Sequence, residues 1–239
     1  MKILVDTHTH TLASGHAYST IQEMAVAAKE HGVEAICFTE HAPLMPGSCG
    51  SFYFSNTRIL PRERWGIHTL YGVELNILNA NGEVDLPDAL LRKMDIVIAS
   101  VHMPCYQGNF TKEELTAAVI RTMENPYVNI IGHPDDSRAP MDYEELVKAA
   151  KRTNTLLELN NSSMRPDNFR MGAKENVKEL LHYCEKYGVM IATGSDAHLD
   201  LDAGLFPNVY AAIEENHFPE ELIATTSLEK LKPFINRYK

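Results

Sequence analysis

Seven short hydrophobic segments recur along the chain, and longer amphipathic or polar stretches separate them. Each segment is rich in Ile, Val and Leu and apolar on both faces, which is typical of parallel strands buried on both sides. Because parallel neighbours need a crossover connection, we expect helices between them. The predicted strands are 3–5, 35–38, 70–73, 96–100, 128–131, 156–159 and 190–192.

Helix signals mark several of the intervening stretches. Two of them end before a glycine, Gly32 or Gly188, and glycine is common just past a helix C-terminus. A third begins with Thr111 and Glu114 in the spacing of a capping box, and a fourth begins with an acidic variant of it. The predicted helices are 20–31, 111–124, 142–152 and 175–187.

Strand and helix alternate seven times, which predicts an α/β fold in a single domain over residues 1–239. Such units build either an open doubly wound sheet or a closed TIM-like barrel. The first strand is not followed by a glycine-rich phosphate loop, which disfavours a dinucleotide-binding sheet. Residues 43–64 form the longest predicted loop, and we expect them to be able to cover one face of a barrel.

Composition narrows the classes of protein. Hydrophobic residues at 44% and charged residues at 23% are globular values. The apolar runs are far shorter than the ~20 residues of a membrane span, and Met1 leads directly into a strand without a signal peptide, so we expect a cytoplasmic protein. The four cysteines show no Cys-x-x-Cys spacing, which fits reduced structural thiols. A net charge of −10 argues against a large nucleic-acid partner, and a homo-oligomer is compatible with the sequence.

Two pairs of metal-binding residue types stand near the two ends of the chain. His8 and His10 leave the first predicted strand on the same side, because strand side chains alternate with period two. Asp196 and His198 repeat the same spacing after the last predicted strand. Each pair has the geometry of a chelate.

Other predicted strands also end in metal-binding types. Any single one has an ordinary explanation, such as a hydrogen-bonded surface histidine or an N-cap for Asp196. The whole set is harder to explain in that way, since seven of the eleven histidines belong to it. At three or four ligands per ion, the nine residues of the set would bind two or three ions. Imidazole and carboxylate ligands without thiolate suit Zn²⁺, Mn²⁺ or Fe²⁺. The set comprises His8, His10, His16, His41, Glu74, His102, His133, Asp196 and His198.

These motifs, in this order over nearly the whole chain, resemble those of the polymerase-and-histidinol-phosphatase (PHP) superfamily. The compact length is most similar to its YcdX-type phosphatase branch. The resemblance implies a distorted seven-stranded (β/α) barrel and hydrolysis of a small phosphate monoester through a metal-bound hydroxide. The motifs are Asp6-Thr7-His8-Thr9-His10, Thr39-Glu40-His41, Gly72-Val73-Glu74, Ser100-Val101-His102, Gly132-His133-Pro134 and Gly194-Ser195-Asp196-Ala197-His198.

The resemblance also implies a centre of three divalent ions, with Zn²⁺ expected and Mn²⁺ or Fe²⁺ as alternatives. It assigns the catalytic part to Glu74, Asp196 and His198. The implied ligand sets are His8, His10, Glu74 and Asp196 for the first ion, Glu74, His102 and His133 for the second, and His16, His41 and His198 for the third.

A phosphate substrate favours an arginine near the metals. The predicted strand 156–159 supplies no metal ligand, so its polar end is expected to face the substrate. Arg165 is the first candidate there, with Asn160 and Ser163 behind it, and Arg138 follows His133. For either arginine the ordinary alternative is a solvated surface charge.

Two other functions remain open. An amidohydrolase-type barrel acting on C–N or C–O bonds shares the first His-x-His, but such sites often use a bridging lysine, and residues 96–101 contain none. It also does not need His16, His41 and His198. The third function is a non-catalytic, metal-stabilised accessory module, as in some polymerases; this chain has no room for a polymerase and its ligand set is intact.

Overall fold

The strands run parallel around a nearly closed barrel in the computed structural model, which describes residues 1–238. The first and last strands meet through a bridge between Thr9 and Ala197, and the Asp196 N–H donates to the His8 carbonyl at 2.8 Å. This confirms the predicted distorted TIM-like barrel in one domain. In order around the barrel the strands are β1 (Val5–Thr9), β2 (Ala35–Phe38), β4 (Ile67–Asn76), β5 (Ile96–Ser100), β6 (Ile130–Ile131), β7 (Leu156–Asn160) and β8 (Ile191–Gly194).

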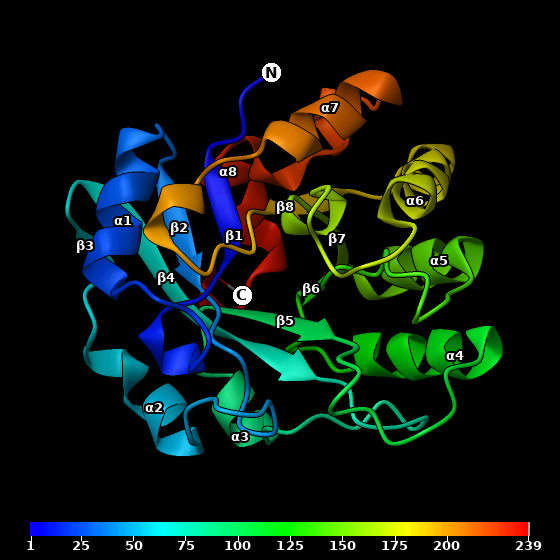
Figure 1. Ribbon diagram of the computed structural model, residues 1–239, viewed down its shortest axis with the longest axis horizontal. Helices are drawn as coiled ribbons and strands as arrows, with labels where there is room; N and C mark the ends of the chain where they lie inside the picture. The colour runs from blue at the N-terminus through cyan, green and yellow to red at the C-terminus, as the bar shows by residue number, and fades with distance from the viewer. Residues whose placement is uncertain (239) are drawn as a thin grey trace.

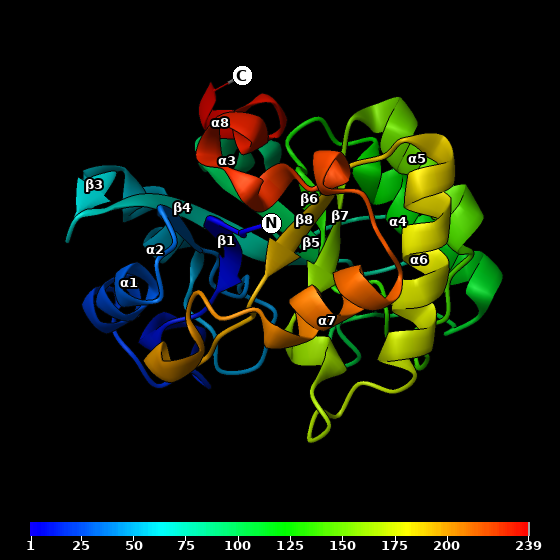
Figure 2. The same cartoon turned by 90° about the horizontal axis from the view of Figure 1, so that it is seen from above.

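Helices surround the strands, with α1 and α2 on one side and α4, α5 and α6 packed side by side on the other (Figures 1 and 2). Thr20 caps the first helix in a full capping box with Glu23, and the Asp142 carboxylate accepts from the Glu145 N–H at 3.1 Å. The helices are α1 (Ile21–Glu30), α2 (Ser51–Asn56), α3 (Asp88–Leu91), α4 (Lys112–Met123), α5 (Tyr143–Thr153), α6 (Ala173–Tyr187), α7 (Pro207–Glu215) and α8 (Leu228–Leu231).

Several predicted elements differ from the structure, among them the strand predicted at 70–73, which extends over Ile67–Asn76 as β4. The first strand covers Val5–Thr9 rather than 3–5, because buried hydrogen bonds accommodate Asp6, Thr7 and His8 in a strand that looks polar. The strand predicted at 128–131 is shorter, since β6 covers only Ile130–Ile131. The predicted loop 43–64 contains α2 and the short strand β3 (Glu63–Arg64), which pairs antiparallel with β4.

The inside of the barrel is apolar at the amino ends of the strands. Small and branched side chains from every barrel strand meet there, and the C-terminal segment around α8 closes this end. A larger apolar cluster fills the space between the strands and the helices. The inner cluster consists of Val5, Ala35, Cys37, Leu70, Ile96, Ile98, Ile130, Leu156, Ala192, Ala224, Leu228, Leu231 and Ile235.

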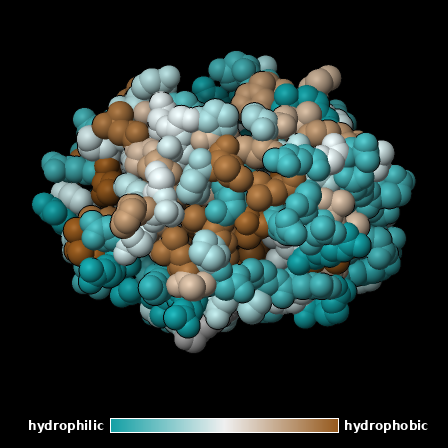
Figure 3. Space-filling model, turned by 90° about the horizontal axis from the view of Figure 1, so that it is seen from below, coloured by the Kyte–Doolittle hydropathy of each residue, from teal (hydrophilic) through white to brown (hydrophobic). Residues whose placement is uncertain are grey.

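The side of the molecule that carries α2, α3 and α4 is mostly hydrophilic, with hydrophobic residues gathered near its middle (Figure 3). None of the helices within residues 1–238 is long and apolar enough to cross a membrane.

Candidate metal centre

All nine predicted ligand residues gather at the carboxyl ends of the strands. They lie on β1, on β4 and in the loops that follow β1, β2, β5, β6 and β8. Six of them are buried, His102 and His198 are half-buried, and His16 is exposed at the mouth. Parallel strands bring these ends to one edge of the barrel, so residues up to 190 positions apart share one site.

The Glu74 carboxylate lies at the centre, and its two oxygens face different histidines. One oxygen, Oε1, is 2.8 Å from His133 Nε2 and 3.2 Å from His102 Nε2. The other, Oε2, is 2.6 Å from His41 Nδ1, 3.4 Å from His8 Nε2 and 3.6 Å from His10 Nε2. One carboxylate therefore stands between two groups of nitrogen atoms, as a bridging ligand must.

The two carboxylate oxygens of Asp196 also face different partners. Its Oδ1 is 3.3 Å from His10 Nε2 and 3.7 Å from His8 Nε2, whereas its Oδ2 accepts from Arg170 Nη1 at 3.0 Å. The predicted third set is also brought together, with the ring centre of His16 4.8 Å from that of His41 and 5.0 Å from that of His198.

Several buried polar atoms in this cluster make no hydrogen bond, although two of them, His41 Nδ1 and Glu74 Oε2, lie 2.6 Å apart. Burial of an unpaired polar group costs free energy, so a convergent set of such atoms indicates a missing ligand. Nitrogen and carboxylate donors of this kind fit a divalent transition metal. The atoms are His8 Nε2, His10 Nε2, His41 Nδ1, Glu74 Oε2 and His102 Nε2. Three triads have ligand atoms within 4.8 Å of one another: His8, His10 and Glu74; His10, His41 and His198; His41, Glu74 and His102.

The pKa values of His10, His16 and Glu74 suit cation binding, whereas that of His8 is raised well above its usual value because Glu158, Glu74 and Asp196 outweigh the effect of burial. Burial, with His41 and His198 nearby, holds the pKa of His10 well below its usual value and lowers that of His16 to about 4. Both rings are therefore neutral at pH 7, the form that binds metal. Burial opposes ionisation of Glu74, yet neighbouring His102, His8 and His41 hold its pKa well below the ordinary value.

Hydrogen bonds on the far side of several rings fix their orientation. His198 Nδ1 lies 3.0 Å from the Asp196 carbonyl, which can only accept, so Nδ1 carries the proton. His102 Nδ1 is held in the same way by Asn76 Oδ1 at 2.7 Å, and His10 Nδ1 lies 3.2 Å from Ser14 Oγ, which itself donates to Glu40 at 2.6 Å. Each contact leaves Nε2 free to bind a metal.

Glu158 on β7 is a functional candidate that the sequence analysis missed. Its carboxylate accepts from His8 Nδ1 at 2.8 Å and from the His133 N–H at 2.7 Å. A Cβ on Gly194 would collide with Glu158 Oε1 and with His8, so only glycine fits beside this contact. The sequence does mark Glu158 in one way, since it is a charged residue inside an otherwise apolar predicted strand.

Asp6 ties β1 to the loop that carries Asp196 and His198. Its carboxylate accepts from the backbone N–H groups of Ser195 at 2.9 Å and Gly204 at 2.8 Å. Burial raises the pKa of Asp6 to about 6, although these hydrogen bonds act in the opposite direction. Asp196 and His133 adopt positive φ angles of 54° and 28°, and such backbone strain is common at functional sites.

A family model described as the PHP domain matches residues 6–191. The chain belongs to the PHP domain family. This confirms the predicted family, while the extent of the domain over 1–239 stays a prediction.

Relatives of this PHP protein match it over nearly their full length. A protein of Acetivibrio thermocellus named probable phosphatase is 45% identical over all of this chain and 98% of its own. A probable phosphatase of Thermoanaerobacter sp. strain X514 is 42% identical over all of this chain and 97% of its own.

Solved structures share the fold. Histidinol phosphate phosphatase from Lactococcus lactis, in complex with Zn, L-histidinol and phosphate, has a TM-score of 0.68 at 23% identity, over 97% of this chain and 98% of that one. A putative histidinol phosphatase from Listeria monocytogenes has a TM-score of 0.57 at 16% identity, over 86% of this chain and 99% of that one.

A cleft of about 640 Å³ opens above the histidine cluster of the PHP barrel. Arg138 and Arg165 line it, as does Arg170, which the sequence analysis missed because nothing local marks it. Asn160 and Ser163 instead lie beneath the cleft. Asn160 Nδ2 donates to Asp196 at 3.3 Å, and Ser163 Oγ donates to Asn160 Oδ1 at 3.2 Å, so both support Asp196 from behind. Their contact with substrate stays a prediction.

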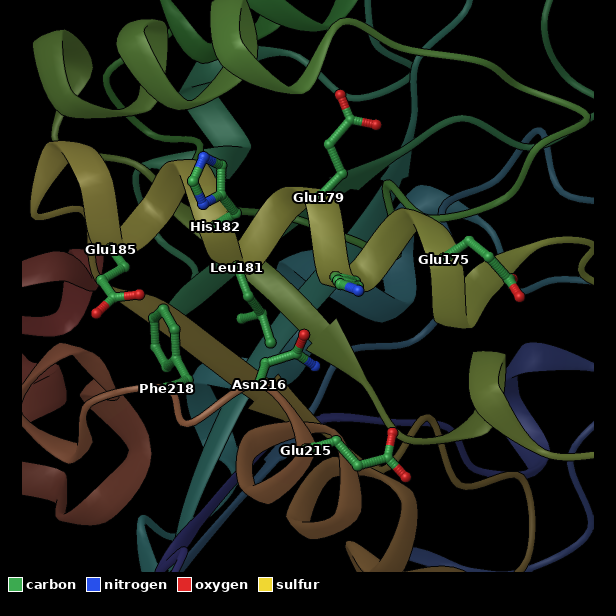
Figure 4. A pocket seen from close by; sticks show the side chains of 9 residues that line it. Glu175, Glu179, Leu181, His182, Glu185, Glu215, Asn216 and Phe218 are labelled. Atoms are coloured by element: carbon green, nitrogen blue, oxygen red, sulfur yellow. The ribbon is translucent and has the colours of Figure 1, made fainter.

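A second hollow, of about 490 Å³, lies on the outside of the barrel between α6 and the end of α7. Figure 4 shows the carboxylates of Glu175, Glu179 and Glu215 spread apart around it rather than pointing at one another. Within the described chain, no metal-competent triad forms there. The chemistry is therefore concentrated at the other hollow.

Proposed function

We propose that this PHP protein is a metal-dependent phosphatase that hydrolyses a small phosphate monoester at a centre of three divalent ions. The convergence of unpartnered, buried nitrogen and oxygen atoms on Glu74 is the observation that carries the proposal. The names of the full-length relatives support the reaction, and the zinc, histidinol and phosphate bound by the L. lactis structure support the metal and a small substrate.

We assign the ligand sets as the family resemblance implies them. Glu74 would bridge two ions, since its Oε1 faces His102 and His133 and its Oε2 faces His8 and His10. His41 lies between sets, because its Nδ1 also reaches Glu74 Oε2. Zn²⁺ is the expected metal, with Mn²⁺ or Fe²⁺ as alternatives.

When bound, the ions supply an activated water at neutral pH and positive charge for the phosphoryl oxygens. The chain orients them, because Glu158 and Asn76 fix the rings of His8 and His102. Asp196 is held ionised by His8 and Arg170 against the effect of burial, which keeps its pKa well below the usual value and leaves it in the charged form that binds a metal.

Three groups at the mouth complete the proposed site. His198 faces the cleft, where a leaving alcohol would emerge, and Arg138 and Arg165 stand on the wall as proposed contacts for phosphate. Both arginines are paired with aspartates, and since a guanidinium carries five N–H donors, each can donate to phosphate while it keeps its aspartate.

The test is hydrolysis of p-nitrophenyl phosphate by the purified protein, after chelation and after reloading with Zn²⁺ or Mn²⁺. We expect activity only in the reloaded protein. Activity on an amide or lactone without activity on phosphate esters would favour the amidohydrolase alternative. A large fall in melting temperature on chelation, with no turnover of any ester, would favour the accessory module.

A further inference from the structure

Apolar side chains from five different loops surround the mouth of the cleft. Tyr18 and Phe169 remain 73% and 69% exposed, although both are large and aromatic. Isolated exposed apolar residues are ordinary, but a group gathered around one opening indicates a binding surface. We call this group the apolar collar; it consists of Tyr18, Met45, Met103, Phe169 and Leu199.

Charges on the cleft walls are balanced in pairs. Each aspartate that lines the cleft within residues 1–238 contacts an arginine, and no lysine lines it there. A cationic ligand therefore meets no free carboxylate on the wall. The pairs are Arg138 with Asp136 at 2.5 Å, Arg165 with Asp202 at 2.9 Å, and Arg170 with Asp196 at 3.0 Å.

Two of these arginines hold one of the two exposed aromatic rings of the collar, that of Phe169. The guanidinium carbons of Arg138 and Arg170 lie 5.0 and 5.5 Å from the ring centre of Phe169, within the range of cation–π contacts. The aromatic surface is thus positioned before a ligand arrives, which reduces the entropy cost of binding.

We propose that the apolar collar binds the leaving group of the substrate, and that this group is uncharged and apolar, with an aromatic ring as the best fit. The inference rests on the proposed phosphatase function. A phosphoryl group placed at the histidine cluster directs its ester substituent out of the cleft and against the collar. An ammonium group in that position loses hydration and gains no partner on the wall.

Three esters of primary alcohols test this preference in the metal-loaded protein: ethyl, 2-phenylethyl and 2-aminoethyl phosphate. We expect kcat/KM for the phenylethyl ester to exceed that for the ethyl ester by roughly tenfold or more, from burial of the ring. The aminoethyl ester should be the poorest substrate. Equal values for the first two esters, or a preference for the aminoethyl ester, would overturn the proposal.

Variants locate the effect. Tyr18→Ala and Phe169→Ala should each lower the phenylethyl-to-ethyl ratio of kcat/KM by about threefold or more, as expected from loss of apolar contact area. Phe52→Ala is the matched control, since Phe52 is 89% exposed on α2 and does not line the cleft. An unchanged ratio in both collar variants would contradict the inference.

Measuring the binding of phosphonates, which are not hydrolysed, tests the apolar collar independently of the proposed phosphatase activity. If the metal-loaded protein hydrolyses none of the esters, the phosphatase proposal fails, but the collar is still tested by calorimetry with 2-phenylethylphosphonate and ethylphosphonate. Tighter binding of the phenylethyl compound, weakened in Tyr18→Ala, supports the collar. Equal affinities, or no binding of either compound, overturn it.

Discussion

The two ends of the barrel are built from the same seven strands but from opposite kinds of residue. At the carboxyl ends, buried imidazoles and carboxylates point at one another and several of their atoms lack partners. At the amino ends, apolar side chains are closed off by α8 and Ile235. There Asp95 is fully engaged, accepting from the Tyr71 N–H at 2.8 Å and contacting Arg62 Nε at 2.7 Å. Burial of apolar side chains at the amino end stabilises the fold. This stabilisation offsets the free-energy cost of burying the polar cluster at the carboxyl end.

The strongest test of this division is Glu74→Gln. The amide keeps the volume but removes the charge that faces five histidines, so kcat/KM and the metal affinity of the two sites that share Glu74 should both fall by more than the ~100-fold that loss of an outer-shell partner can cost. Elemental analysis and ester hydrolysis measure the two effects. Glu179→Gln on α6 is the control glutamate outside the cluster. Normal metal content in Glu74→Gln would contradict the central position of Glu74.

Leu231→Ala probes the opposite end. Leu231 is fully buried in the inner apolar cluster, so truncation should lower the free energy of unfolding by about 2–5 kcal/mol. Metal content should not change. Urea denaturation measures the first and elemental analysis the second, with the exposed Leu201→Ala as control. Loss of metal without loss of stability would contradict the proposed division between a stabilising amino end and a metal-binding carboxyl end.

The raised pKa of Asp6 predicts that the stability of the protein depends on pH. Its pKa rises from 3.8 to about 6 on folding, so between these values the native state binds more protons than the unfolded state. The free energy of unfolding should therefore fall as pH rises from about 4 to 6, by roughly 3 kcal/mol from this group. Asp6→Asn should lack this contribution. Urea denaturation of both chelated proteins across this range tests it, and identical pH slopes would contradict it.

Glu158→Gln should have a smaller effect that concerns the metal centre alone. The amide oxygen can still accept from His8 Nδ1, but the negative charge that favours this contact is lost. Metal affinity should fall by about 10–100-fold, as is typical for such supporting partners. Titration of the chelated protein with Zn²⁺ measures it, beside Glu179→Gln. Unchanged affinity would leave Glu158 a purely structural residue.

Local patterns predicted much of this molecule. β2 and β5 have the predicted bounds, because their apolar runs carry the whole signal. The nine strand-end residues could be found because parallel strands place them at one edge. By contrast, Glu158 and Arg170 contact residues more than twenty positions away, which no spacing reveals. The closure of the barrel by α8 depends likewise on contacts distant in sequence.

We propose that the polar end of the barrel holds three ions through nine ligand residues, of which Glu74 is shared by two ions. Elemental analysis of the purified protein, reloaded with Zn²⁺ and freed of excess metal, tests it most directly. We expect close to three ions per chain, and a clear loss in His8→Ala while the fold is retained. One ion or none per chain, or full metal content in His8→Ala, would contradict the account.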